Sequence, residues 1–426
     1  MRKESRTVDP CHQVDSASGQ RHLPLVDLLV DARAELMELA VASGMKVLHV
    51  MLEEDRTAVC GPRYAHLSDR QAVRAGTVPS EVVFGGRKVA IQRPRVRSHG
   101  HEVPLPTFQA VADTDPLNRR VVEQMLLGVA TRQYERSLEP IGGEVITRGT
   151  SKSAVSRRFV TRTTAQLNTW RSMSLDTLDL VALMVDSVHV AEHCVVVALG
   201  IDTTGKKHAL GLWHGSTENT TVCQSLLANL QSRGLRTDRS LLIILDGSKA
   251  LHRAVTNLFG QAALIQRCQV HKRRNVLEHL PERQRPWVRA ILNRAYARPD
   301  VATARRLLLD LARRLEDQYP SAAESVREGL DETLTVLTLG ISDRLRHSLA
   351  TTNAIESLLS RTRHVKRNVK RWRSGTMVVR WVAAGILEAT KGFRRLQGKP
   401  EMPKFVAALR ARDQQLGLGE VNQNVA

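Results

Sequence analysis

The sequence predicts an α/β protein in which an all-helical insertion interrupts a mixed β-sheet, and in which helical and hairpin regions precede that sheet. Two observations support this fold class. Between residues 180 and 271, strand and helix patterns follow one another in the order strand, strand, strand, helix, strand, helix, strand. From about residue 276 to 339, the chain is instead amphipathic and helix-forming, with a break at Pro320. A chain of 426 residues exceeds what one core usually organises, so we expect several domains.

Charge indicates the class of partner. The chain has 63 Lys and Arg residues against 43 Asp and Glu residues, a formal net charge of +20, and 42% of its residues are hydrophobic. A basic surface of this size favours a polyanion, and nucleic acid is the partner we expect because phosphate neutralisation releases counterions. The alternative is a basic protein that its charge merely keeps soluble.

Composition also excludes several classes of protein. The polar first residues, MRKESRTVDPCHQVD, contain no apolar signal core, and no run approaches the roughly 18 apolar residues that span a bilayer. We therefore expect a soluble, cytoplasmic, nucleoid-associated chain. The cysteines are odd in number and scattered, at positions 11, 60, 194, 223 and 268, which argues against a disulfide framework.

The N-terminal region predicts a helix followed by a basic hairpin. Apolar periodicity from about Leu25 to Leu52 indicates a helix that ends before the turn at Cys60. In SEVVFGGRKVAIQRPRVR, two β-rich runs flank Gly85-Gly86, a pair suited to a tight hairpin turn. A nucleic-acid groove and a solvated surface are both consistent with the basic residues of this hairpin, which are Arg87, Lys88, Arg93, Arg95 and Arg97.

The next region resembles a pair of helices joined by a break. Residues 117–138 form one helical segment, which ends near Pro140, and Thr150-Ser151 can cap a second one. Lys152, Arg157 and Arg158 lie near the start of that second helix, where a recognition helix contacts DNA. We interpret the pair as helix–turn–helix; the alternative is an amphipathic pair that links two domains.

Two aspartates end predicted strands of the sheet. Three runs, LVALMVDSVHV, CVVVALGID and KHALGLWHG, form an antiparallel meander, and a helix with Thr217 as cap and Gly234 as terminator follows. LLIILD is then apolar on both faces and indicates a buried strand. If this fourth strand pairs with the first, Asp186 and Asp246 become neighbours. A charge at the end of an apolar strand is costly without a compensating cation, so the pair indicates divalent metal ions. Alone, Asp246 could equally belong to an Asp-Gly turn.

A third carboxylate follows the helical insertion. In ATTNAIESLLSRTRHVKRNVKRWR, Asn353 can cap a helix that carries Glu356 in its first turn. The structural interpretation is a capping box; the functional one is a rigid carboxylate that faces a metal ion. The run that follows favours phosphate binding over a solvated face, and its predicted DNA contacts are Arg361, Arg363, Lys366, Arg367, Lys370 and Arg371.

RCQVHKRRN places Cys268 and His271 three residues apart. Half of a zinc site, a thiol–imidazole pair and a simple strand end all fit this spacing. No second ligand pair accompanies it, which argues against zinc. A catalytic dyad is the least favoured interpretation, because a His three residues from a Cys on a strand end should face away from it. Lys272, Arg273 and Arg274 follow at once and are predicted to contact DNA.

Taken in order, four motifs resemble the Mutator-type family of bacterial insertion-sequence transposases, which are DDE transposases. They are Asp186, LDGSKAL with Asp246, RCQVHKRRNV with Cys268 and His271, and TTNAIES with Glu356. The match runs from about Val181 to near Arg373 and extends more weakly to RKVAIQRPRVR and GTSKSAVSRRF upstream. One departure is Ser187, which stands where the family often has glycine after the first carboxylate.

The resemblance implies a ribonuclease-H-like catalytic domain that binds two Mg²⁺ ions, with Mn²⁺ as a substitute, through Asp186, Asp246 and Glu356. Cys268 and His271 would support the active site. The expected activity is cleavage of insertion-sequence ends and strand transfer into target DNA by an oligomer, at least a dimer. A DNA-binding regulator without cleavage and a nuclease that does not join strands are the alternatives. The predicted regions are 1–112, with the DNA-binding hairpin; 113–175, helix–turn–helix-like; 176–275, first catalytic part; 276–345, helical insertion; and 346–426, the Glu356 helix and basic C-terminal region.

Overall fold

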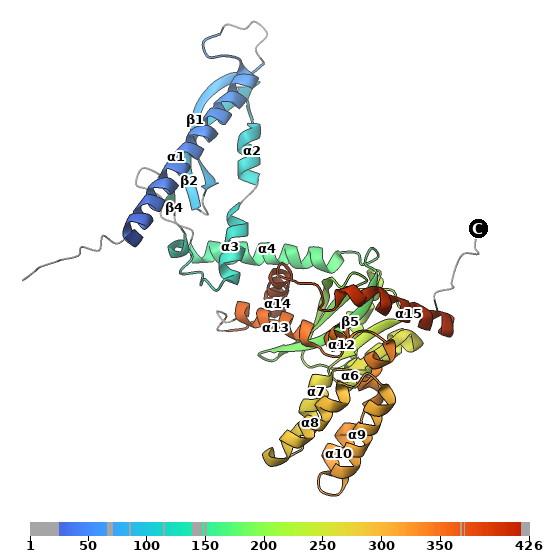
Figure 1. Ribbon diagram of the computed structural model, residues 1–426. Coiled ribbons are helices and arrows are strands. Elements are labelled where there is room, and N and C mark those ends of the chain that lie inside the picture. The colour runs from blue at the N-terminus through green and yellow to red at the C-terminus, as the bar shows by residue number, and fades with distance from the viewer. Residues whose placement is uncertain are drawn as a thin grey trace, which may run out of the picture. The chain divides into compact units, whose positions relative to one another are not determined.

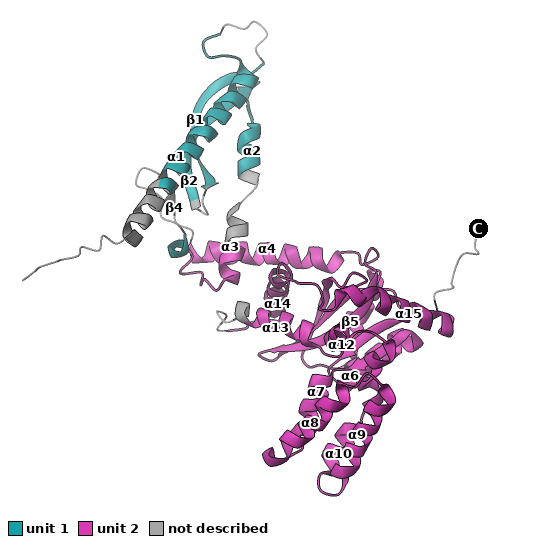
Figure 2. Cartoon of the chain, viewed as in Figure 1, with its two compact units in different colours: residues 1–117, 135–150 teal, residues 118–134, 151–426 magenta. Residues whose placement is uncertain are grey.

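The computed structural model describes residues 25–65, 71–84, 87–113, 116–138, 147–148, 151–366, 369 and 371–418 (Figure 1). The chain divides into two compact units, one of residues 1–117 with 135–150 and the other of residues 118–134 with 151–426 (Figure 2). Among the helices of the described ranges, none combines the length and apolar character needed to cross a membrane.

The first unit is a long helix packed on a hairpin. Its elements are α1 (Leu25–Cys60), β1 (Val73–Phe84), β2 (Arg87–Ser98), β3 (His101–Val103), α2 (Pro106–Asp113) and β4 (Thr147–Arg148). Strands β1 and β2 pair antiparallel with Val82 opposite Val89, which confirms the predicted hairpin, although its Gly85-Gly86 turn lies outside the described residues. Leu52 of α1 is fully buried against this hairpin.

Carboxylates neutralise part of the hairpin's basic charge. Lys88 lies 2.5 Å from Glu81, and both Arg93 and Arg95 pair with Glu102 at 2.7 and 3.0 Å. These three cations are therefore already engaged in the free protein. A polyanion would have to compete with the carboxylates for them.

The helix–turn–helix interpretation does not fit the connection between α3 (Pro116–Leu126) and α4 (Lys152–Ser172). The first helix is shorter than predicted, because Gly128 adopts a positive φ of 101° just after it. The chain between the two helices includes β4, which pairs with β2, so it is not the tight turn of three or four residues that the motif requires. Helix α4 begins where predicted, since the Ser151 side chain accepts from the Ala154 amide at 3.3 Å.

The second unit contains the predicted mixed sheet. Its strands are β5 (Leu180–Val190), β6 (His193–Asp202), β7 (Lys207–Gly215), β8 (Leu241–Leu245) and β9 (Ala263–Arg267), in the spatial order β7-β6-β5-β8-β9. The first three form an antiparallel meander, and the fourth pairs with the first in parallel. The topology that brings the two aspartate-bearing strands together is thus confirmed.

Helices cover both faces of this sheet. Leu242 and Ile244 of β8 join a core with α14 (Gly375–Thr390), whereas Leu241, Ile243 and Leu245 join one with α5 (Thr220–Ser232) and α6 (Lys249–Phe259). This explains why β8 is apolar on both faces. The cap of α5 differs from the prediction: Asn219, not Thr217, accepts the Val222 amide at 2.9 Å.

The interval between β9 and the Glu356 helix is helical, as predicted. Its helices are α7 (Gln269–Glu278), α8 (Arg285–Tyr296), α9 (Val301–Glu316), α10 (Pro320–Arg327), α11 (Leu330–Thr333) and α12 (Asp343–Leu349). After it come α13 (Asn353–Lys366), α14 and α15 (Met402–Leu416). Helix α13 ends at Lys366, so Arg371 of the basic run lies beyond this helix.

Candidate active site

Asp186 lies within β5, and Asp246 directly follows β8, the parallel strand beside it. In the β5–β8 pairing, Ala182 is opposite Leu242 and Met184 is opposite Ile244. The same register, continued by two residues, places Asp246 beside Asp186. Each carboxylate also accepts a backbone amide, Asp186 from Ser187 at 2.8 Å and Asp246 from Ser248 at 2.9 Å.

Burial and neighbouring charges raise the pKa of Asp186 to about 7. Desolvation is the main cause, and the negative charges of Asp246 and Glu356 add to it. The Ser187 amide and the charge of His271 act in the opposite direction. Asp246, Glu356 and His271 therefore all lie close enough to Asp186 to change its pKa.

Glu356 is held by the residue that precedes its helix. The Glu356 amide donates to the Thr352 carbonyl at 2.9 Å, so the helix starts one residue earlier than the predicted capping box requires. The Thr352 hydroxyl donates to Glu356 Oε1 at 2.6 Å. The capping-box interpretation with Asn353 was thus wrong, and Thr352 performs the positioning instead.

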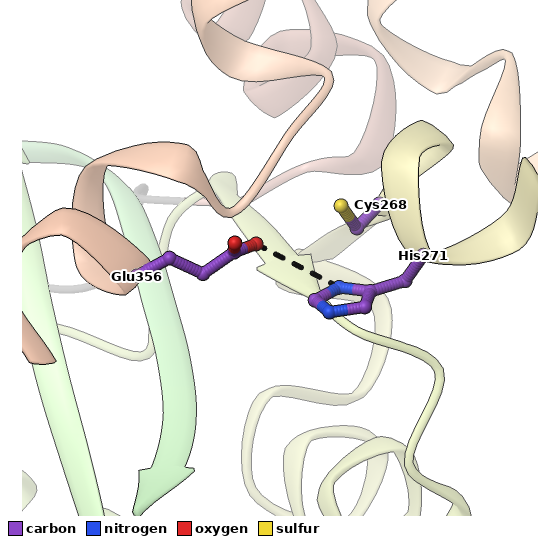
Figure 3. A group of neighbouring side chains, drawn as sticks. All are labelled: Cys268, His271 and Glu356. Atoms are coloured by element: carbon purple, nitrogen blue, oxygen red, sulfur yellow. Dashed lines mark ion pairs between the residues drawn. The ribbon is translucent and has the colours of Figure 1, made fainter. Parts of the chain in front are cut away.

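Cys268 and His271 meet this carboxylate from the other side (Figure 3). Thr352 Oγ1 lies 3.3 Å from both Cys268 Sγ and His271 Nδ1, and His271 Nδ1 lies 3.8 Å from Glu356 Oε1. A hydrogen bond with Cys268 raises the pKa of His271 to about 8, burial opposes this, and the charges of Cys268 and Glu356 contribute. Near neutral pH, the imidazole is therefore largely a cation beside a carboxylate.

The start of α7 explains why Cys268 and His271 converge. Cys268 follows β9, as expected, but it is the N-cap of α7, and His271 is in that helix's first turn. A cap residue and the third helical residue lie on the same side of a helix, unlike residues three apart in a strand. The prediction that the two side chains face apart was therefore wrong.

Cys268, His271 and Glu356 offer ligand atoms that all lie within 4.8 Å of one another, and they are the only such trio among the described residues. Asp186 and Asp246 lie outside this trio. Cys268 Sγ already accepts from the Thr352 amide at 3.4 Å and lies 3.3 Å from the Thr352 hydroxyl oxygen. Although burial opposes it, hydrogen bonds from His271 and Thr352 lower the pKa of Cys268. The thiol is thus engaged in holding Thr352.

The oxygen donors fit a hard divalent cation. The negative charges of Asp246 and Glu356 help to raise the pKa of Asp186, which indicates a place where positive charge would be stabilising. Carboxylate oxygens are the ligands that Mg²⁺ prefers. Asp186, Asp246 and Glu356 are therefore the residues here that could hold such ions.

The predicted DNA-contacting residues differ in exposure. On α4, Lys152 and Arg157 are exposed and Arg158 is half-buried. Lys272 is only 3% exposed, and its ammonium donates to the Glu328 carbonyl at 2.5 Å, so it does not present its charge at the surface. Arg273 is half-buried and donates to Asn293, and Arg274 is exposed.

The residues of the C-terminal basic run lie partly outside the described ranges. Arg361, Arg363 and Arg371 are exposed. The side chain of Lys366 is not described, and Arg367 and Lys370 lie outside the described residues.

Two residues near the site were missed by sequence analysis. Thr352 lies within TTNAIES, but the misplaced helix start hid its role. Glu218 accepts a hydrogen bond from the hydroxyl of Ser187, next to Asp186, and it follows β7 in a segment without any motif. Only the fold could reveal that it lies here.

Comparisons with known proteins show which family this chain is similar to. A family described as transposase, Mutator family, matches residues 29–395. A transposase for insertion sequence element IS256 in transposon Tn4001 from Staphylococcus aureus is 25% identical over 80% of this chain and 87% of its own length. A transposase for insertion sequence element IS406 from Burkholderia multivorans is 28% identical over 77% of this chain and 85% of its own length.

Proposed function

The chain belongs to the Mutator family of transposases, and from this premise we propose that it cuts DNA at the ends of an insertion sequence and joins the freed 3′-hydroxyl to target DNA. In this proposal it is a DDE enzyme with a ribonuclease-H-like catalytic domain, and Asp186, Asp246 and Glu356 hold two Mg²⁺ ions. The observation that carries the proposal is that Asp186 lies in β5 and Asp246 directly follows β8, its parallel neighbour, with Glu356 close enough to raise the pKa of Asp186.

Cleavage and joining are both in-line displacements at phosphorus. Two divalent ions, when bound, activate the attacking oxygen and stabilise the leaving one. The protein's part is to hold the carboxylates rigidly. Backbone amides of Ser187 and Ser248 fix one oxygen each of Asp186 and Asp246. The Thr352 hydroxyl fixes Glu356.

Cys268 and His271 serve this arrangement as supports. The Cys268 sulfur accepts the Thr352 amide, while the imidazolium of His271 lies near Glu356 and lowers the electrostatic cost of gathering three carboxylates. Before metal binds, the positive charge of His271 thus offsets part of the negative charge of the three carboxylates.

Metal removal tests the proposed reaction. We expect the full chain to nick labelled insertion-sequence ends in Mg²⁺ and to leave them intact in EDTA, read on a denaturing gel. With a pre-cleaved end and a target duplex, a transposase also yields joined product. Cutting without joining would indicate a nuclease, and binding with neither reaction would indicate a regulator; either result contradicts the proposal.

Thr352→Val is expected to reduce Mg²⁺-dependent cleavage by about 10- to 100-fold, the usual cost of losing a residue that orients a metal ligand. The half-saturating Mg²⁺ concentration should rise in the same variant. Thr351→Val is the matched control, because the buried Thr351 hydroxyl has no hydrogen-bond partner among the described residues. Thr352→Ser should retain activity. Equal losses in the Thr351 and Thr352 variants would contradict the positioning role.

DNA is the partner that this family membership supports. The proposal further includes an oligomer, at least a dimer, because two element ends must be brought together. It also includes a cytoplasmic, nucleoid-associated location, where target DNA is found.

A further inference from the structure

A cationic cavity of about 830 Å³ lies in the second unit, at the end of the sheet away from the aspartates. Its walls come from the second half of α4, from the turn that leads into β7, and from the end of α14 with the residues after it. All of its lining residues belong to the same compact unit, so its shape is set within one body.

Five basic side chains line this cavity, and no acidic one does among the described residues. They are Arg162, Lys206, Lys207, Arg394 and Arg395. None of the five forms an ion pair with a carboxylate in the described part of the chain, unlike the cations of the first unit's hairpin. His208, which also lines it, pairs with Asp202 at 2.8 Å. The cavity therefore concentrates uncompensated positive charge.

A further cation, Arg361, adds to the positive charge near the cavity. Burial lowers the pKa of Lys207, and the charge of Arg361 lowers it further. Arg361 comes from α13, the helix of Glu356, and its guanidinium lies against Gly392. Because like charges oppose one another here, an anion bound in the cavity would relieve a cost that already exists in the free protein.

Part of the cavity lining is apolar. Trp170 is only 5% exposed, and its indole N–H donates to the Ala209 carbonyl at 2.9 Å, which ties α4 to β7. Leu387 and Phe393 complete the apolar lining. A lining that combines cations with apolar side chains suits the charged phosphates and the less polar sugars of a nucleic-acid strand.

The register of the sheet relates this cavity to the carboxylates. Lys207 pairs with Ile201 of β6, and Ile201 pairs with Ala182 of β5. Asp186 lies further along β5 from Ala182, by about 13 Å at 3.3 Å per residue, and two strand spacings add about 10 Å across the sheet. The separation is therefore about 16 Å, or about five base pairs of duplex at 3.4 Å each.

We propose that this cavity binds the sugar–phosphate backbone of duplex DNA, about five base pairs from the phosphate that is cut. The proposal rests on the proposed DNA cleavage at Asp186, Asp246 and Glu356 for the position of that phosphate. It assigns to Arg162, Lys206, Lys207, Arg394 and Arg395 a contact that carries no sequence information, because they meet phosphate and not base edges. Their role is to fix the duplex relative to the carboxylates.

The test measures DNA binding by the full chain in EDTA, where no cutting is expected. Fluorescence anisotropy of a short labelled duplex of mixed sequence is followed over a series of NaCl concentrations. Arg394→Gln/Arg395→Gln should reduce the slope of log affinity against log salt by about 1.8, since each lost phosphate contact removes about 0.9. At 0.1 M salt, this corresponds to about 60-fold weaker binding relative to an unchanged 1 M value.

Two variants control this measurement. Arg313→Gln/Arg314→Gln removes the same charge from two adjacent exposed arginines of α9, and it should leave the slope unchanged. Arg394→Lys/Arg395→Lys keeps the charge and should restore binding. An unchanged slope in Arg394→Gln/Arg395→Gln, or an equal loss in the α9 variant, overturns the proposal.

Lysine modification tests the wild-type chain directly. The duplex should protect Lys206 and Lys207 from acetylation, read by mass spectrometry, and inorganic phosphate at the same phosphorus concentration should not. Equal protection by phosphate would mean a small-anion site and would overturn the proposal. Binding in EDTA is independent of cleavage, so an Asp186→Asn variant that still cuts DNA would refute the proposed catalytic site without touching these results.

Discussion

Asp186→Asn is expected to abolish Mg²⁺-dependent strand cleavage, with a loss of at least about 10³-fold. Asparagine keeps the shape of the side chain but removes the charge that would hold a divalent ion. Metal ions contribute several kcal/mol of transition-state stabilisation, and each 1.36 kcal/mol corresponds to a factor of ten in rate. The measurement is single-turnover cleavage of a labelled element end, with duplex binding in EDTA measured in parallel.

Asp179→Asn is the matched control. Asp179 directly precedes β5, the strand that carries Asp186. Its carboxylate pairs with Arg239 and Arg410. It should leave cleavage unchanged, and both variants should bind duplex normally. Full-rate cutting by Asp186→Asn would remove the basis of the proposed mechanism.

Asp186→Asn should also stabilise the metal-free protein at alkaline pH. Because the folded-state pKa of Asp186 is raised to about 7, its ionisation costs folding free energy. That cost is absent below the unfolded pKa near 4, grows as the pH rises, and is complete above about 7, where it reaches at most about 4 kcal/mol. Asp186→Asn should therefore raise the melting temperature at pH 8 in EDTA and leave it nearly unchanged at pH 4. A lower melting temperature at pH 8 would contradict the assigned pKa.

Gly234→Ala is expected to destabilise the second unit by about 3 kcal/mol. Gly234 follows α5 with a φ of +102°, and a Cβ there would lie 1.8 Å from Asp176 Oδ1 and 2.8 Å from the Asp176 amide nitrogen. The side chain could rotate away, but the backbone nitrogen could not move without shifting the segment that leads into β5. All five tryptophans lie between residues 170 and 381, so the urea midpoint of tryptophan fluorescence reports on this unit.

Gly340→Ala separates the collision from backbone strain. Gly340 has a φ of +62°, and no heavy atom of the described part of the chain lies within 4 Å of its would-be Cβ, so alanine there should cost only about 1 kcal/mol. Similar urea midpoints for the Gly234 and Gly340 variants would mean that Asp176 moves aside at little cost.

The sheet was predictable because its signal is local and strong. LLIIL is apolar on both faces, which is typical of a strand covered on two sides, and this indicated that β8 has strands beside it. The predicted closeness of the two aspartates depends on β8 pairing with β5, and the two strands do pair.

The supporting contacts of the site were not predictable, because they depend on where helices begin. A shift of one residue separates a capping box at Asn353 from the observed contact between Thr352 and Glu356. The first turn of α7, in place of a strand, turns His271 toward Cys268. Helix ends are the least certain feature of a sequence pattern, since several polar residues nearby can serve as caps. The helix–turn–helix interpretation failed for a different reason: β4 pairs with a strand far away in sequence.

The two ends of the helical insertion are tied together at the site. The Gln269 amide donates to the Ala350 carbonyl at 3.0 Å, and the Thr352 amide donates to Cys268 Sγ, 84 residues away in the chain. The entropic cost of closing so long a loop increases only slowly with its length. Relatives could therefore lengthen, shorten or rebuild the intervening helices over evolutionary time, provided that these few bonds survive, without displacing the acidic group that follows them.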